Sequence, residues 1–133
     1  MTIQGDLIKG HAEARLDRQA TVHSSGHQNV HARRYVILRS GDIGIELMII
    51  VKGNTLQLWC EADALDRPVG LGLGGEFRHG SETYSVPSPG GGMRYGRHTG
   101  LKTMNRLHRG DAWHFVPKTV GQLDKIFEAL RLP

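Results

Sequence analysis

The chain has a single cysteine, no apolar run long enough to cross a membrane, and a long central interval without a carboxylate. Because Cys60 is alone, no disulfide can form within the chain, which favours a reducing compartment. The longest apolar run, at residues 45–51, contains Glu46 and is far too short to span a bilayer. The N-terminus shows no apolar stretch of signal-peptide length. These absences predict a cytoplasmic protein that does not associate with membranes.

The interval without carboxylates runs from Thr83 to Gly110 and holds the most organised part of the sequence. Residues 90–110, here called the basic stretch, read GGGMRYGRHTGLKTMNRLHRG. Its basic side chains and histidines are Arg94, Arg97, His98, Lys102, Arg106, His108 and Arg109. Glycine allows the backbone to approach an oxyanion closely, and the whole chain carries a formal net charge of +4. The pattern favours an anionic partner.

A short basic helix is predicted over residues 99–109, because a threonine stands at the N-cap position and Gly110 follows the last turn. On this helix Lys102, Arg106 and Arg109 share one face. Charges spread along a helix suit an extended anion better than a small phosphate. The sequence therefore favours nucleic acid as the partner.

Aromatic side chains offer a second means of binding nucleic acid. Tyr95 lies within the basic stretch, and Tyr35 and Trp59 are predicted on strands. If the sheet face opposite the helix is open, its aromatic rings can stack with bases. The alternative is that Tyr35 and Trp59 pack across strands.

The remainder of the chain predicts an α+β fold with an antiparallel sheet of four or five strands. Alternating apolar residues predict a three-stranded meander over residues 34–61. Further strands are predicted at 83–86 and 111–116, within a segment from 62 to 100 that is otherwise irregular. A capping box followed by apolar side chains at helical spacing predicts a helix over 119–131, packed on the sheet.

The first 33 residues differ from the rest in being polar and rich in histidine. They are predicted to form an N-terminal arm or a short helix over residues 6–18, followed by loop from Thr21 to Arg33. Residues 34–133 are then a single α+β domain. This places a boundary between the arm and the domain near residue 33.

Histidines in the arm raise the question of a metal. The three candidates are His23, His27 and His31. Three imidazoles at this spacing are sufficient for a transition metal, but Ser24-Ser25-Gly26 argues against the helix that would align them. The alternative is a solvated arm. No metal and no cofactor are predicted.

Carboxylates around the meander are a second candidate metal site, since nucleases commonly hold divalent metals with carboxylates. They are Asp42, Glu46, Glu61, Asp63 and Asp66. Glu46 interrupts an otherwise apolar strand, so it needs a partner if its side of the sheet is covered. The alternative is that Glu46 lies on a solvated face and pairs with Arg39 or Gln57.

Two glycine motifs occur without their usual context. Residues 70–75, GLGLGG, match the spacing of a dinucleotide-binding loop, but no acid lies about 20 residues further on. Residues 91–98 approach a P-loop, except that Arg97-His98 replaces the required lysine and hydroxyl residue. Neither motif predicts a nucleotide site.

Three functions are compatible with these features. The leading hypothesis is a small basic cytosolic nucleic-acid-binding domain that contacts DNA or RNA phosphates through the basic stretch. A second is a nuclease or phosphodiesterase in which His98 or His108 is the acid/base group and the arginines clamp the phosphate. A third is a protein-interaction subunit that docks an acidic partner. An exposed strand edge would also allow a homodimer.

Overall fold

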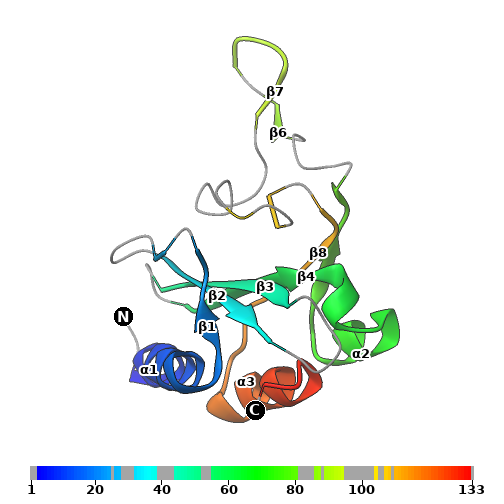
Figure 1. Ribbon diagram of the computed structural model, residues 1–133. Coiled ribbons are helices and arrows are strands. Elements are labelled where there is room, and N and C mark those ends of the chain that lie inside the picture. Colours follow the sequence, from blue (N-terminus) through cyan, green and yellow to red (C-terminus); the bar gives the residue numbers. More distant parts are fainter. Residues whose placement is uncertain are drawn as a thin grey trace.

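An antiparallel sheet forms the centre of the computed structural model of the protein (Figure 1). The structure describes residues 3–24, 26–27, 32–38, 44–51, 55–80, 86–87, 89–94, 104, 107–108 and 110–132. Within these residues the strands follow the spatial order β1 (Thr21–Val22), β2 (Ala32–Ile37), β3 (Ile45–Ile50), β4 (Gln57–Glu61), β8 (Ala112–Phe115) and β5 (Glu76–Arg78). Every neighbouring pair is antiparallel. The predicted fold class and meander are confirmed, and the sheet has six strands rather than four or five.

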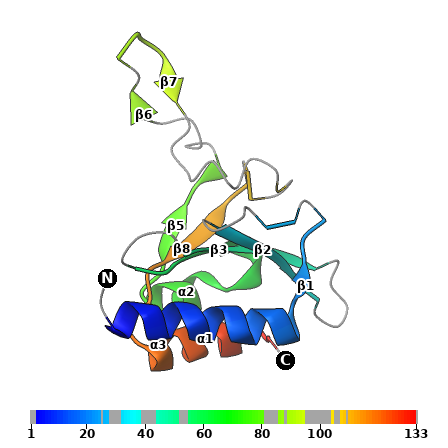
Figure 2. The same ribbon diagram turned by 90° about the vertical axis from the view of Figure 1, so that its left-hand side faces the viewer.

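Two helices cover one face of this sheet, as Figures 1 and 2 show. They are α1 (Ile3–Gln19) and α3 (Val120–Ala129), which also contact each other. The predicted C-terminal helix is thereby confirmed, and a helix forms where a short one was predicted over residues 6–18. On α1, Ile8, Ala12 and Leu16 follow one another at intervals of four residues and are all buried. The N-terminal helix therefore contributes to the same core as the strands.

The main core lies between the sheet and these two helices. Alternate residues of each strand face it, such as Leu47 and Ile49 of β3 and Leu58 of β4. Helix α3 contributes Leu123, Ile126 and Phe127. Each such side chain stabilises the fold by about 1.5–3 kcal/mol when it is fully buried.

The opposite face of the sheet, here called the second face, is also covered. The intervening residues Met48 and Trp59 form a separate buried cluster with Met104 and Leu107 of the basic stretch. All six residues of β3 are consequently buried. The burial of both faces has a direct consequence for Glu46, which lies in this strand.

Several elements occur where the sequence predicted none. The segment after β4 contains a short 3₁₀ helix, η1 (Ala62–Ala64), then α2 (Arg67–Gly72), which is started by a proline, and then the edge strand β5. Strand β1 and the beginning of β2 lie within residues 21–33, which were predicted as loop.

A separate two-stranded hairpin is formed by β6 (Val86–Pro87) and β7 (Met93–Arg94). In both views it stands clear of the sheet on the side opposite α1 and α3 (Figures 1 and 2). Gly91 and Gly92 in its turn have φ values of +94° and +74°, a conformation that favours glycine. Of the strand predicted at residues 83–86, only Val86 lies among the described residues.

Candidate functional site

Most of the residues predicted to bind an anion or to act as a catalytic group lie outside the described residues. These are Tyr95, Arg97, His98, Lys102, Arg106 and Arg109. The backbone of Arg94 belongs to β7 of the protruding hairpin. His108 is half-buried, and its backbone N–H donates to the carbonyl oxygen of Met104 at 3.0 Å. The hypothesis that His98 or His108 is a catalytic acid/base group therefore stays a prediction.

The predicted basic helix is not observed at the positions that the structure describes. Met104 lies in a bend, and Leu107 and His108 lie in a turn; the other positions between 99 and 109 lie outside the described residues. Met104 and Leu107 are fully buried against the second face. The apolar residues Met104 and Leu107 thus pack on the sheet without a helix at the described positions.

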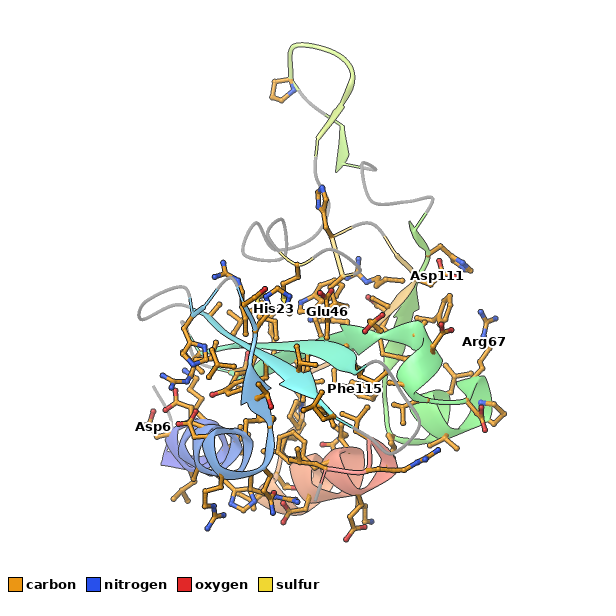
Figure 3. All side chains as sticks on the ribbon, in the orientation of Figure 1. Asp6, His23, Glu46, Arg67, Asp111 and Phe115 are labelled. Atoms are coloured by element: carbon orange, nitrogen blue, oxygen red, sulfur yellow. The ribbon has the colours of Figure 1, made fainter. Side chains whose placement is uncertain are left out.

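A buried histidine–glutamate pair lies on the second face of the sheet. Nε2 of His23 is 2.9 Å from Oε2 of Glu46, and the two residues are 7% and 3% exposed. The other carboxylate oxygen, Oε1, accepts the backbone N–H of Leu107 at 3.0 Å. Figure 3 shows His23 and Glu46 on the side of the sheet away from the helices, whereas Phe115 lies on the helical side. Glu46 thus joins three segments of the chain.

The partners observed for Glu46 are His23 and Leu107. The alternative of a solvated Glu46 is wrong, because the second face is covered and Glu46 is 3% exposed. Oε1 of Gln57 instead lies 3.0 Å from Nε2 of His114, and Arg39 lies outside the described residues. The backbone N–H of Glu46 donates to Oε2 of Glu61 at 2.6 Å, so a second carboxylate adjoins the pair.

His23 is held toward Glu46 by a turn that wraps around Arg34. The backbone N–H of His23 donates to the carbonyl of Arg34 at 3.0 Å, and the N–H of Gly26 returns to the carbonyl of His23 at 2.8 Å. Nη1 of Arg34 donates to the carbonyl of Gly26 at 3.1 Å. Arg34 is 6% exposed, and its burial lowers the pKa of the guanidinium. These hydrogen bonds within the protein therefore hold His23 beside Glu46.

The histidines of the N-terminal segment do not converge in the described part of the chain. His23 contacts Glu46, whereas Nδ1 of His27 accepts the backbone N–H of Arg34 at 3.0 Å. Burial, followed by the charge of Arg33, lowers the pKa of His27. His31 and Asp42 lie outside the described residues. Within the described ranges, no three histidine, cysteine, aspartate or glutamate side chains are placed to hold a metal ion.

The two aromatic residues predicted on an open sheet face are buried instead. Tyr35 is 0% exposed and Trp59 is 3% exposed, so neither ring is available to stack with a base in this structure. The Trp59 ring packs against His114, with centroids 4.5 Å apart, and the guanidinium of Arg78 lies 5.6 Å from its centroid. Burial, followed by the charge of Arg78, lowers the pKa of His114. The alternative of cross-strand packing is correct for Trp59.

The glycine motif at residues 70–75 has a packing explanation. A Cβ on Gly70 would lie 2.6 Å from Cε2 of Trp113, and a Cβ on Gly75 would lie 2.6 Å from Cε1 of Phe115. Real Cβ atoms do not approach other atoms so closely, so both positions require glycine. These glycines let α2 and the following turn lie directly on the aromatic residues of β8, and no nucleotide is needed to account for them.

A cleft of about 460 Å³ opens on the other side of the molecule, between the end of α2 and the start of α3. Gly72, Gly74, Thr119 and Lys125 are among its lining residues. Gln122 spans it, since its Nε2 donates to the carbonyl of Leu73 at 3.3 Å. The side chain of Thr119 caps α3 there by accepting the N–H of Gln122 at 3.0 Å, which confirms the predicted N-cap.

Comparison of the chain with protein-family models, curated proteins and solved structures finds no match. Among the described residues, none of the helices is both long and apolar enough to cross a membrane.

The sequence did not reveal the buried pair of His23 and Glu46. The two residues are separated by 23 positions, and no local pattern links them. The one available signal was a carboxylate in a strand that is otherwise apolar, which predicts a buried partner without identifying it.

Proposed function

We propose that the protein is a nucleic-acid-binding domain that contacts DNA or RNA phosphates through the basic stretch, residues 90–110. The observation that carries the proposal is the position of the β6–β7 hairpin, which stands clear of the sheet opposite α1 and α3 (Figure 2). Residues 90–94 form its exposed glycine turn and its second strand. A protruding glycine turn allows the backbone of a polyanion to approach closely.

The charge of the stretch supports the same proposal. The interval from Thr83 to Gly110 contains no carboxylate, so a phosphate beside it meets no repulsion from its own residues. Release of counterions from the nucleic acid would drive binding, with little dependence on base sequence. Cys60 is the single cysteine of the sequence and is buried, which agrees with the cytoplasmic location that forms part of the proposal.

Apolar packing attaches the C-terminal part of the basic stretch to the domain. Met104 and Leu107 are fully buried in the cluster on the second face. A basic segment attached to the domain at this point loses less conformational entropy on binding than a free tail does.

Fluorescence anisotropy with a labelled single-stranded DNA, the corresponding duplex and the matching RNA tests the proposal. At salt concentrations from about 50 to 300 mM, log affinity is expected to fall linearly with log salt, by about 0.7–0.9 per phosphate contacted. Replacing Arg94, Arg97 and Arg106 together with glutamine should weaken binding at least about tenfold and flatten the salt slope by about 2–3.

A charge-matched control removes three exposed cations from the helical side, namely Arg18, Lys118 and Lys125. Binding by this control should stay within about threefold of the native protein, with an unchanged salt slope. The proposal fails if the native protein does not bind at the lowest salt, or if both triple variants lose affinity equally.

The two other functions give different results with the same samples. Cleavage of the labelled nucleic acids that disappears in a His98→Ala variant would identify a phosphodiesterase. Salt-sensitive binding to an acidic protein, without affinity for any of the nucleic acids, would identify an interaction subunit. Size-exclusion chromatography of the native protein determines whether it is a homodimer.

A further inference from the structure

We propose that Glu46 is a positioning residue for the basic stretch: its buried carboxylate fixes the stretch on the second face and thereby raises the affinity for nucleic acid. The predicted effect of Glu46 on affinity rests on the proposed function. The contact between Glu46 and Leu107 does not, because it can be measured without any ligand.

The contact is direct and has no competitor from bulk water. Oε1 of Glu46 accepts the N–H of Leu107 at 3.0 Å, and Leu107 is 0% exposed. Oε2 is occupied by His23 at 2.9 Å. Because both oxygens face donors from different segments, one carboxylate fixes the position of Leu107 relative to β3 and to the turn that carries His23.

Packing by itself does not define this position. The side chains that surround Leu107 include Met48 and Met104, and methionine adapts readily to alternative packing. A hydrogen bond from a buried N–H is directional, and leaving that N–H without an acceptor costs about 1–3 kcal/mol. The carboxylate therefore selects one arrangement among several that the apolar contacts would allow.

Glu46 could affect nucleic-acid binding in two ways, through its negative charge and through its hydrogen bond to Leu107. A negative charge near a nucleic-acid-binding segment opposes binding, so its removal alone would raise affinity. If Glu46 positions the stretch, a variant that loses the acceptor for the Leu107 N–H together with the charge should bind nucleic acid more weakly. Two variants that remove the same charge but differ in this acceptor distinguish the two effects.

Glu46→Gln and Glu46→Met form this matched pair. Glutamine keeps a carbonyl oxygen for the N–H of Leu107, and its amide can donate to Nε2 of His23 in the other tautomer. Methionine has a similar length and no such acceptor. Amide hydrogen exchange by NMR measures the anchor directly, and anisotropy with single-stranded DNA measures its effect on affinity.

In the native protein and in Glu46→Gln, the Leu107 amide should exchange at least about 100-fold more slowly than in an unstructured chain. In Glu46→Met this protection should be lost while the amides of Ile49 and Leu58 stay protected, which shows that the sheet is intact. Affinity for the DNA should fall about tenfold in Glu46→Met and be unchanged or higher in Glu46→Gln.

An unprotected Leu107 amide in the native protein overturns the inference, even if Glu46→Met does not fold. Equal protection of the Leu107 amide in Glu46→Gln and Glu46→Met also overturns it. So does equal affinity of the two variants for the DNA when only Glu46→Met has lost the protection. If the native protein binds no nucleic acid, the proposed function fails. The exchange of Leu107 then decides alone whether Glu46 anchors the stretch.

Discussion

Gly70 of α2 and Trp113 of β8 are packed so closely that a Cβ on the glycine would lie 2.6 Å from Cε2 of the indole. Trp113 is fully buried, and Phe77 and Phe115 lie beside it, with ring centroids 5.2 and 6.2 Å away. The indole therefore has little room to move away from a side chain at position 70. The contact connects a glycine-rich stretch of the sequence to the centre of the main core.

Replacement of Gly70 by alanine should consequently destabilise the protein, by about 1–3 kcal/mol, because the added methyl group overpacks the core. Gly72, in the same helix, has no atom within 4 Å of its Cβ position. Gly72→Ala should therefore be neutral or stabilising by up to about 1 kcal/mol, through helix propensity. Urea denaturation measures both variants, and equal stabilities would contradict the packing explanation.

Removal of the cap of α3 should destabilise the C-terminal helix. Oγ1 of Thr119 accepts the N–H of Gln122 at 3.0 Å, while Oε1 of Gln122 accepts the N–H of Lys118 at 2.8 Å. Thr119→Ala leaves the Gln122 N–H without its acceptor and should lower the free energy of unfolding by about 1 kcal/mol. Thr119→Ser retains the oxygen, so its stability in urea should stay close to that of the native protein.

The hydroxyl of Tyr35 should make stability sensitive to alkali. It donates to Oδ1 of Asp17 at 2.7 Å and accepts Nε–H of Arg33 at 2.9 Å. Burial, with the hydrogen bond to Asp17, raises the pKa of Tyr35 to about 12. A pKa raised in the folded state means that the contribution is complete below about pH 10 and is lost as the pH rises toward 12.

Tyr35→Phe isolates this effect. The variant should be less stable than the native protein by about 0.5–1.5 kcal/mol at pH 8, because it lacks both hydrogen bonds. The difference should shrink between pH 10 and 12, because in this range Tyr35 loses its proton in the unfolded state but keeps it in the folded state. Urea unfolding of the two proteins at pH 8, 10 and 11 provides the measurement, and a constant difference would count against the buried network.

Asp124 should contribute stability that acid removes. Its Oδ1 lies 2.7 Å from Nε2 of His11 and accepts Nη1 of Arg15 at 3.2 Å, which joins α3 to α1. The hydrogen bond with His11, followed by that with Arg15, lowers the pKa of Asp124. A lowered pKa means that the contribution is present above about pH 4 and is lost as the pH falls through the folded-state value.

Asp124→Asn should therefore cost about 0.5–1 kcal/mol at pH 7, the magnitude usual for a partly exposed pair. This cost should decrease below pH 4. The exposed Glu128 on the same helix provides a control, since Glu128→Gln should leave stability within about 0.5 kcal/mol at all pH values. A cost for Asp124→Asn that does not vary between pH 7 and 3 would show that the ionised carboxylate is not what joins the helices.

The elements that the sequence predicted correctly are those whose signal is local. The alternation around Leu47 and Leu58 specifies strands of a meander, and the spacing of Leu123, Ile126 and Phe127 specifies a helix with one apolar face. Each pattern needs only neighbouring residues to be recognised. The fold class followed from these patterns.

The elements that it missed depend on contacts between distant residues. Gly70 and Gly75 resemble loop residues until Trp113 and Phe115 are placed against them. Glu46 was recognisable as a carboxylate in an apolar strand, but nothing in that strand identifies His23 and Leu107 as its partners. The positive charge of the basic stretch could be predicted from the sequence, but the hydrogen bond between the Leu107 N–H and Glu46 could not.

The double covering of β3 also bears on aggregation. Residues 45–50, IELMII, combine high strand propensity with a single charge, a composition typical of segments that form cross-β fibrils. In the folded protein α1 and α3 cover one side of this strand, and the apolar residues of the basic stretch cover the other. We expect the charge of Glu46 to oppose self-association of this segment whenever the second face becomes uncovered.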